Sequence, residues 1–170
     1  PYFVDVNESD WVANQRAIKD AVEELGDELA AVIVYNTFGT AIDLEPFAEL
    51  HRSGVPVIID AAPSFGARTV DGQPFGKGFP GLLAFSLHAT KPFGIGEGGL
   101  LYSGNAELIE LVRRLSNFGF DQPGVTSAHG LNAKLPEISA AVGLAVCDGY
   151  AGKMERLIET FQHYLDELKG

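Results

Sequence analysis

The chain has 170 residues and a formal net charge of −11, with a sequence pI of about 4.6, 46% hydrophobic residues and 21% charged residues. This composition is typical of one globular domain that is long enough to bury a core. The acidic balance and the lack of a Lys and Arg cluster argue against nucleic acid as a partner, because phosphate backbones are bound by basic patches.

The redox and targeting signals of the sequence are few. Cys147 is the only cysteine, so no disulfide can form within the chain, which fits a reducing compartment. No apolar run approaches the roughly 18 residues of a membrane span. The opening stretch, PYFVDVNESDW, lacks the basic start and long apolar middle of a signal peptide. We therefore expect a cytoplasmic protein without a membrane partner. Because the chain begins with proline, we also expect it to be a piece of a longer protein.

Four short apolar runs predict strands. They are LAAVIVY at 29–35, VPVIID at 55–60, LLAFSL at 82–87 and GLLYS at 99–103. Continuous apolar runs of this length are typical of strands that are covered on both faces, as in a parallel sheet. The segment YFVDV at the start of the chain is a fifth candidate strand.

Apolar residues at helical spacing predict helices between and after the strands. The predicted helices span 10–25, 44–53, 106–117, 135–150 and 153–168. Strands that alternate with helices indicate an α/β fold whose mostly parallel sheet is flanked by helices. We find no internal repeat or linker, so residues 1–170 form a single domain in this interpretation, with turns in the loose stretch 70–81.

Chemically active side chains stand at the ends of two predicted strands. Asp60 ends the run 55–60, and Ser86, His88 and Lys91 stand at or just after the end of the run 82–87. In open α/β sheets, ligands bind outside the carboxyl ends of the strands. If the two strands are near neighbours, all four groups can line one crevice. Taken singly, Asp60 could cap a turn and Lys91 could be a solvated surface residue.

Four blocks of sequence resemble a known family. VIIDAAPSFGA, FSLHATKPFGIGEGG, NFGF and GLNAKLPEISAAVGLA look like the DegT/DnrJ/EryC1/StrS family of pyridoxal-phosphate-dependent sugar aminotransferases, over about residues 2–147. The resemblance implies an aspartate aminotransferase-like large domain of fold type I. It also implies that residues 1–170 are the central part of that domain, without an N-terminal segment and a C-terminal small domain.

The resemblance assigns roles to several residues. Lys91 matches the lysine that forms a Schiff base with pyridoxal phosphate and afterwards moves a proton. Asp60 matches the aspartate that keeps the pyridine nitrogen of the cofactor protonated. Ser86 matches the serine that hydrogen-bonds the cofactor phosphate. His88 belongs to the same motif and counts as a cofactor-site residue, for which a packing or orienting role is the safer interpretation.

Two further positions are open to alternatives. Asn132 resembles the asparagine that reaches the phosphate in the partner subunit of family dimers, but it could equally cap a helix that begins nearby. Pro63 stands where the family commonly has a glutamine beside the cofactor ring, and proline cannot donate a hydrogen bond. This departure bears on substrate choice and on the tuning of the cofactor.

The implied function is the transfer of an amino group, from an amino-acid donor such as glutamate or glutamine, onto a keto-sugar nucleotide. A homodimer is implied for the full-length protein, and we expect residues 1–170 alone to have little or no activity. Two alternatives stay open. The protein could be another fold type I pyridoxal enzyme that acts on an amino acid, or a non-enzymatic relative that binds cofactor or a partner chain for regulation.

Other motifs carry less weight. Gly94, Gly96 and Gly99 form a literal G-x-G-x-x-G, but a strand follows them where a dinucleotide site needs a helix, so we interpret them as a tight backbone path beside Lys91. The four histidines lack metal-ligand spacing, and we expect no metal site. No G-x-S-x-G elbow is present, which argues against a serine hydrolase.

Overall fold

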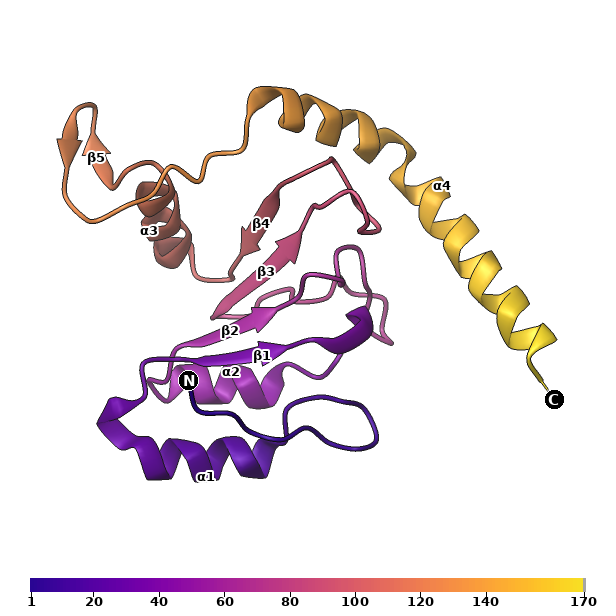
Figure 1. Ribbon diagram of the computed structural model, residues 1–170, viewed down its shortest axis with the longest axis horizontal. Helices are drawn as coiled ribbons and strands as arrows, with labels where there is room; N and C mark the ends of the chain where they lie inside the picture. Colours follow the sequence, from indigo (N-terminus) through magenta and orange to yellow (C-terminus); the bar gives the residue numbers. More distant parts are fainter. Residues whose placement is uncertain (170) are drawn as a thin grey trace.

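The computed structural model describes residues 1–169, and a four-stranded sheet lies at its centre (Figure 1). The strands lie side by side in chain order as β1 (Val32–Tyr35), β2 (Val57–Asp60), β3 (Leu82–Ser86) and β4 (Gly99–Tyr102). The first three strands run parallel, and β4 runs antiparallel to β3. The structure therefore confirms the predicted α/β fold with a mostly parallel sheet. Each strand falls inside one of the four apolar runs.

Two helices cover one face of this sheet. α1 (Gln15–Leu25) begins after Asn14, whose side chain accepts a hydrogen bond from Ala17 N and so satisfies a free backbone donor at the first turn. α2 (Glu45–Arg52) has a proline in its first turn, where no backbone N–H is needed. The predicted start of the first helix at residue 10 was wrong. Trp11 has a φ of 60°, which is incompatible with a right-handed helix.

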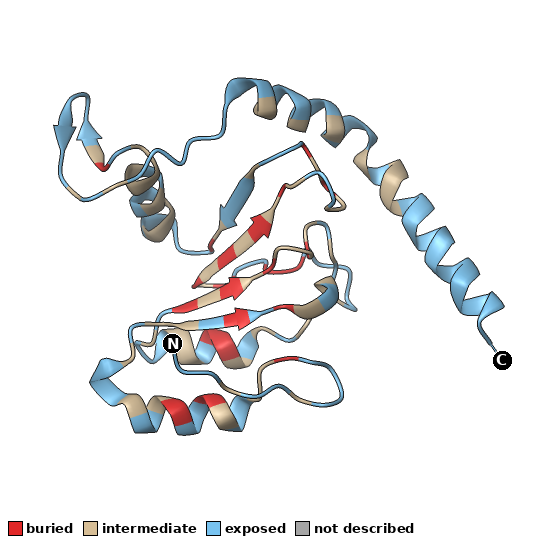
Figure 2. Ribbon diagram, in the orientation of Figure 1, coloured by how far each residue is buried: buried red, intermediate tan, exposed pale blue. Residues whose placement is uncertain are grey.

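The main core lies between the sheet and these two helices. Val34, Ile59 and Leu83, at the centre of three neighbouring strands, have no exposed surface. They pack in one cluster with Ile18 of α1 and Phe47 of α2. Figure 2 shows the buried residues concentrated in β1, β2 and β3 and on the sheet-facing sides of the two helices. Alternate residues of these three strands thus point toward α1 and α2.

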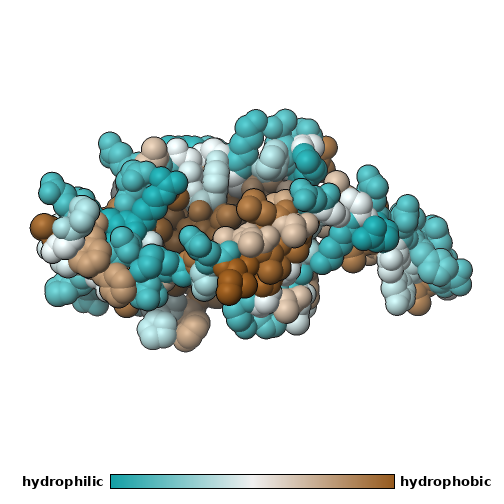
Figure 3. All heavy atoms as spheres, turned by 90° about the horizontal axis from the view of Figure 1, so that it is seen from above, coloured by the Kyte–Doolittle hydropathy of each residue, from teal (hydrophilic) through white to brown (hydrophobic). Residues whose placement is uncertain are grey.

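The opposite face of the sheet is not covered, which corrects the expectation of strands buried on both faces. Ile33 and Tyr35 alternate with the buried residues of β1 and are 70% and 55% exposed. Leu101 of β4, on the same face by its pairing with Ala84, is also exposed. Seen from above, apolar side chains gather over the middle of the molecule, beside the mainly hydrophilic projecting part of the last helix (Figure 3).

Several smaller elements complete the fold. Two short 3-10 turns flank β1, at Gly26–Glu28 and Thr37–Gly39. After β4, the helix α3 (Ala106–Ser116) begins at Asn105, whose side chain accepts from the backbone N–H groups of the first turn. A two-stranded antiparallel ribbon follows, made of β5 (Phe120–Gln122) and β6 (Val125–Thr126).

The structure corrects two further predictions, one for each end of the chain. The segments predicted as separate helices at 135–150 and 153–168 form one continuous helix, α4 (Glu137–Glu167), because Gly152 is accommodated inside it. The opening segment YFVDV is not a strand, since its backbone makes only an isolated bridge between Val6 and Ala13. No helix within residues 1–169 is both long enough and apolar enough to span a membrane.

A second, smaller core attaches α4 to the loop that follows β3. Leu87, Phe93 and Ile95 are buried in this loop and pack against Val146 and Tyr150 of α4. The Tyr150 hydroxyl donates a hydrogen bond of 2.8 Å to the backbone oxygen of Phe65, in the loop after β2. The helix is therefore docked on the loops at the carboxyl ends of the strands, whereas its C-terminal half projects into solvent (Figure 2).

Candidate functional site

The carboxyl ends of the three parallel strands lie at one edge of the sheet, and each is followed or ended by a polar residue. Asn36 follows β1, Asp60 ends β2 and Ser86 ends β3. β2 and β3 are direct neighbours, with Asp60 paired to Ala84. This edge is where open α/β sheets bind ligands. Asp60 ends its strand as predicted, Ser86 is the last residue of β3, and the two strands are neighbours, which is the condition for a shared crevice.

The strand register also places Asp60 and Ser86 on the same face of the sheet. Residues paired across parallel strands share a face, so Asp60 lies on the side of Ala84 and, two residues on, of Ser86. The intervening residues, Ile59 and Phe85, point to the opposite face and are buried in the core under α1 and α2. The two polar side chains thus stand on the uncovered face, where a ligand can reach them.

The carboxylate of Asp60 is held by the turn that it begins. Its Oδ1 atom accepts a hydrogen bond of 3.1 Å from Ala62 N, which is a local side chain-to-backbone bond typical of aspartate at a turn. This is the turn-capping role that the sequence left open as an alternative. Within residues 1–169 no second hydrogen bond engages the carboxylate, so Oδ2 remains able to accept one from a ligand.

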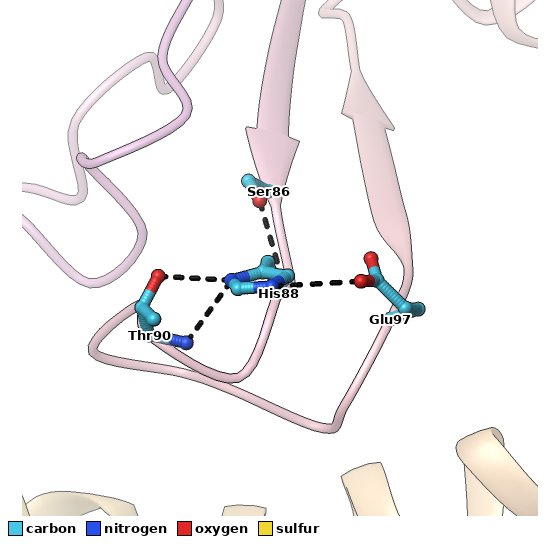
Figure 4. A network of polar contacts seen from close by, with 4 residues as sticks. All are labelled: Ser86, His88, Thr90 and Glu97. Atoms are coloured by element: carbon cyan, nitrogen blue, oxygen red, sulfur yellow. Dashed lines mark hydrogen bonds and ion pairs between the residues drawn. The ribbon is translucent and has the colours of Figure 1, made fainter.

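His88 lies in a small polar network with Ser86, Thr90 and Glu97 (Figure 4). The backbone N–H of Thr90 donates to His88 Nδ1 at 3.2 Å, and the Thr90 hydroxyl lies 2.9 Å from the same atom. Because a backbone N–H can only donate, Nδ1 acts as an acceptor and the ring proton of the neutral imidazole sits on Nε2. Nε2 lies 3.5 Å from the Glu97 carboxylate.

These contacts order the segment that leads from Ser86 to Lys91. The Ser86 hydroxyl oxygen accepts from His88 N at 3.2 Å, which leaves its own proton free to donate to a ligand. Lys91 N donates to His88 O at 2.9 Å and closes the turn. In the described residues His88 thus contacts the turn, and a direct contact with cofactor stays a prediction.

Lys91 stands at the tip of an extension of the β3–β4 pair. Backbone bonds from Leu87 N to Gly98 O and from Ala89 N to Gly96 O continue the ladder beyond the strands. Gly94 lies so close to the returning chain that an added Cβ would sit 2.6 Å from Ala89 O. The glycine-rich stretch is therefore a tight backbone path beside Lys91. The Lys91 amine forms no ion pair within residues 1–169.

Asn132 lies beside the end of α3 and not in the turn around Lys91. Its backbone forms an isolated bridge with Asn117 at the end of α3, and its side chain is exposed. The suggestion that it caps a helix was wrong, because α4 begins five residues later with Pro136 at its N-cap. A contact of Asn132 with the phosphate of a partner subunit stays a prediction, and the exposed side chain is free to make one.

Two residues beside the site, Asn36 and Ser64, were not predicted from the sequence. Both are buried, and the side-chain amide of Asn36 donates to the Ser64 hydroxyl at 2.7 Å. One signal could have found Asn36: it follows an apolar run as Asp60 ends one. Nearby, Gly39 has a φ of 76° and an added Cβ would lie 2.7 Å from Pro63 O. The loops after β1 and β2 are thus packed tightly together around Pro63.

Several surface hollows lie away from these groups. Four surface hollows of about 370–620 Å³ lie along α1, α2, α3 and the loop 64–77. Asp60, Ser86 and Lys91 line none of these four. The polar groups instead stand on an open sheet edge beside an uncovered apolar face.

A mostly parallel sheet with Asp60 and Ser86 at its carboxyl edge, and Lys91 in the turn that follows, is the arrangement that the resemblance to aminotransferases implies. The profile of the DegT/DnrJ/EryC1/StrS aminotransferase family matches residues 1–170. The chain belongs to this family, as the four sequence blocks predicted.

Three similar proteins show the extent of the likeness. A crystal structure of a putative PLP-dependent aminotransferase from Bacillus cereus is 42% identical, with a TM-score of 0.93 over 99% of this chain and 46% of that one. The Mycobacterium tuberculosis protein named Protein MT3510 is 36% identical over 146 residues, covering 85% of this chain and 35% of its own length. A dTDP-4-amino-4,6-dideoxy-D-glucose transaminase from Shigella dysenteriae is 32% identical over 145 residues, covering 85% and 38%.

These likenesses confirm the fold type I architecture and the enzyme class of the family. The chain spans less than half the length of each of these three proteins.

Proposed function

We propose that the complete protein transfers an amino group to a keto-sugar nucleotide with pyridoxal phosphate as cofactor. The observation that carries the proposal is the register of β2 and β3, which places Asp60 and Ser86 on one uncovered face, with Lys91 five residues beyond Ser86. In this proposal the carboxylate of Asp60 and the amine of Lys91 would hold a flat cofactor ring. Such a ring draws in electrons and stabilises negative charge that develops on the substrate carbon.

The residues present fit this cofactor in their chemistry. The free Oδ2 of Asp60 can accept the N–H of a pyridine ring, and a carboxylate there keeps the ring nitrogen protonated. The Ser86 hydroxyl has a proton to donate to a phosphate oxygen. The Lys91 amine would hold the cofactor covalently, and when free and neutral it would serve as the base that moves a proton from the substrate carbon.

The substrate class follows from the relatives. The Shigella dysenteriae relative is named a dTDP-sugar transaminase, which supports a sugar nucleotide as amino acceptor for this protein. We further propose glutamate or glutamine as donor, a homodimer in which Asn132 reaches the partner's cofactor phosphate, and a cytoplasmic location. Residues 1–170 are in this proposal the central part of the large domain. We also propose that these residues alone have little or no activity.

The test is cofactor binding by the complete protein. Added pyridoxal phosphate should give the visible absorbance band of lysine-bound cofactor, and borohydride reduction should fix it to Lys91, as read by peptide mass spectrometry. Lys91→Ala should abolish the band, whereas Lys77→Ala, at an exposed lysine bonded to Gln73, should leave it unchanged. Asp60→Asn should weaken cofactor binding about tenfold or more, since a charged partner of the ring proton is lost. A band that survives Lys91→Ala would contradict the proposal.

A further inference from the structure

The loops that follow β1 and β2 are joined by a buried polar contact that none of the roles above uses. The Asn36 side-chain amide nitrogen donates to the Ser64 hydroxyl at 2.7 Å, and also to the backbone oxygen of Thr40 at 2.9 Å. We propose that Asn36 and Ser64 are positioning residues that fix the direction of the Asp60 carboxylate toward the cofactor ring. The inference rests on the proposed function, because it assigns a purpose to the geometry around Asp60.

The contact is fully removed from water. Asn36 has no exposed surface and Ser64 is 1% exposed. The carbonyl oxygen of Thr40 can only accept, so it fixes which end of the Asn36 amide faces it and excludes the flipped orientation. Within residues 1–169 the Asn36 Oδ1 atom has no hydrogen-bond partner. A buried acceptor without a partner is unfavourable, and an aliphatic residue at this position would avoid that cost. What Asn36 adds over an aliphatic residue is the pair of donations from Nδ2 to Ser64 and Thr40.

A short series of bonds leads from this contact to Asp60. The backbone of Asn36 donates to Asp60 O at 2.9 Å, so Asn36 is fixed to both ends of the turn 60–64. Inside the turn, Ser64 N donates to Ala61 O at 2.8 Å, and Ala61 N donates to Ala84 O of β3 at 2.9 Å. The Asp60 carboxylate is oriented by Ala62 N, the middle of the same turn.

The direction of the carboxylate consequently depends on the position of Ala62, and the turn has anchors on both sides of that residue. On one side the strand ladder fixes Asp60 and Ala61, and on the other side Asn36 holds Ser64. If the second anchor is removed, Ala62 N can move and the carboxylate loses its preset direction. Catalytic groups need to be held within a fraction of an ångström, so a modest loosening is enough to weaken the pairing with a ring nitrogen.

The experiment compares variants of the complete protein loaded with pyridoxal phosphate. Ser64→Ala and Asn36→Ala should each raise the cofactor dissociation constant about fivefold to tenfold, the size expected for one buried hydrogen bond. Both should also lower the pH at which half of the bound cofactor carries a proton on its ring nitrogen, read by nitrogen NMR on isotope-labelled cofactor. The control, Thr37→Ala, lies in the same loop but donates to Trp11 O, and it should stay within about twofold of the wild type.

Two double variants test the mechanism. Because Asn36 and Ser64 act through one bond, the double variant should be no worse than Asn36→Ala alone. In an Asp60→Asn background, Ser64→Ala should have no further effect on the ring proton, because the carboxylate it positions is gone. If Asn36→Ala fails to fold, Ser64→Ala decides the matter, since it removes a single oxygen.

The outcomes separate this inference from the proposed function. A ring-proton midpoint that is unchanged in Ser64→Ala, together with a lower melting temperature, would show a purely structural contact and overturn the inference, while the proposed function stands. Wild-type protein that takes up no pyridoxal phosphate overturns both. An effect of Ser64→Ala that persists undiminished in the Asp60→Asn background would show that Ser64 acts on the cofactor by another route, which also overturns the inference.

Discussion

Tyr150 joins the long helix α4 to the loop that follows Asp60. Its replacement by phenylalanine tests how much this contact contributes to stability. Its hydroxyl donates to Phe65 O at 2.8 Å, and its ring packs against Phe65 and Phe93 with centroids 5.8 and 5.1 Å away. An added Cβ on Gly66 would collide with the tyrosine ring, so the contact is close. Tyr150→Phe removes the hydrogen bond alone and leaves the ring packing in place.

The expected loss follows from that single bond. One intramolecular hydrogen bond stabilises the folded state by about 0.5–1.5 kcal/mol net, so the free energy of unfolding in urea should fall by about 1 kcal/mol. Tyr150→Ala removes the half-buried ring as well and should cost about 2–4 kcal/mol. The control, Tyr164→Phe, lies on the same helix with an exposed ring and should change stability by less than about 0.5 kcal/mol. Equal effects of Tyr150→Phe and Tyr164→Phe would refute the reasoning.

The same side chain predicts a pH dependence. Burial raises the pKa of Tyr150 above the usual value of about 10. As pH rises past 10, Tyr150 loses its proton in the unfolded chain before it does so in the folded chain. The free energy of unfolding therefore falls until the pH passes the raised pKa of Tyr150 in the folded state. The advantage of the wild type over Tyr150→Phe should therefore be full below pH 10 and should shrink above it. An advantage that stays constant through this range would show that the phenol is not shielded from water.

Three further changes around the lysine turn can be predicted. Glu97→Gln should alter stability by less than about 0.5 kcal/mol, measured by thermal unfolding, because its contact with His88 is a solvent-exposed pair. Gly94→Ala should destabilise the protein by about 1–3 kcal/mol and slow the borohydride labelling of the lysine, because the new Cβ would press on Ala89 O and displace the turn. Ser86→Ala should raise the cofactor dissociation constant about tenfold with little change in stability, as titration by absorbance would show; an unchanged constant would remove Ser86 from the site.

The sequence alone determined the four strands of the central sheet and where the chemistry stands along the chain, whereas YFVDV was wrongly predicted as a strand and β5 and β6 were not predicted. Four apolar runs gave four strands, because a run of large aliphatic residues needs burial and extended backbone satisfies it in few residues. Asp60 and Ser86 ended their strands as predicted, and the four family blocks indicated the family that the profile match confirmed. These features are local in the chain, so the sequence pattern contains them.

The tertiary structure decided what depends on distant contacts. Alternation along a strand shows that two faces exist, but only the packing of α1 and α2 determines that Asp60 and Ser86 lie on the uncovered one. The bond between Asn36 and Ser64 joins residues 28 positions apart, which no local pattern reveals. The continuity of α4 through Gly152 likewise could not be predicted from helix propensity, which disfavours glycine by about 1 kcal/mol. Local preferences select the elements, whereas long-range packing and hydrogen bonds determine which side chains meet.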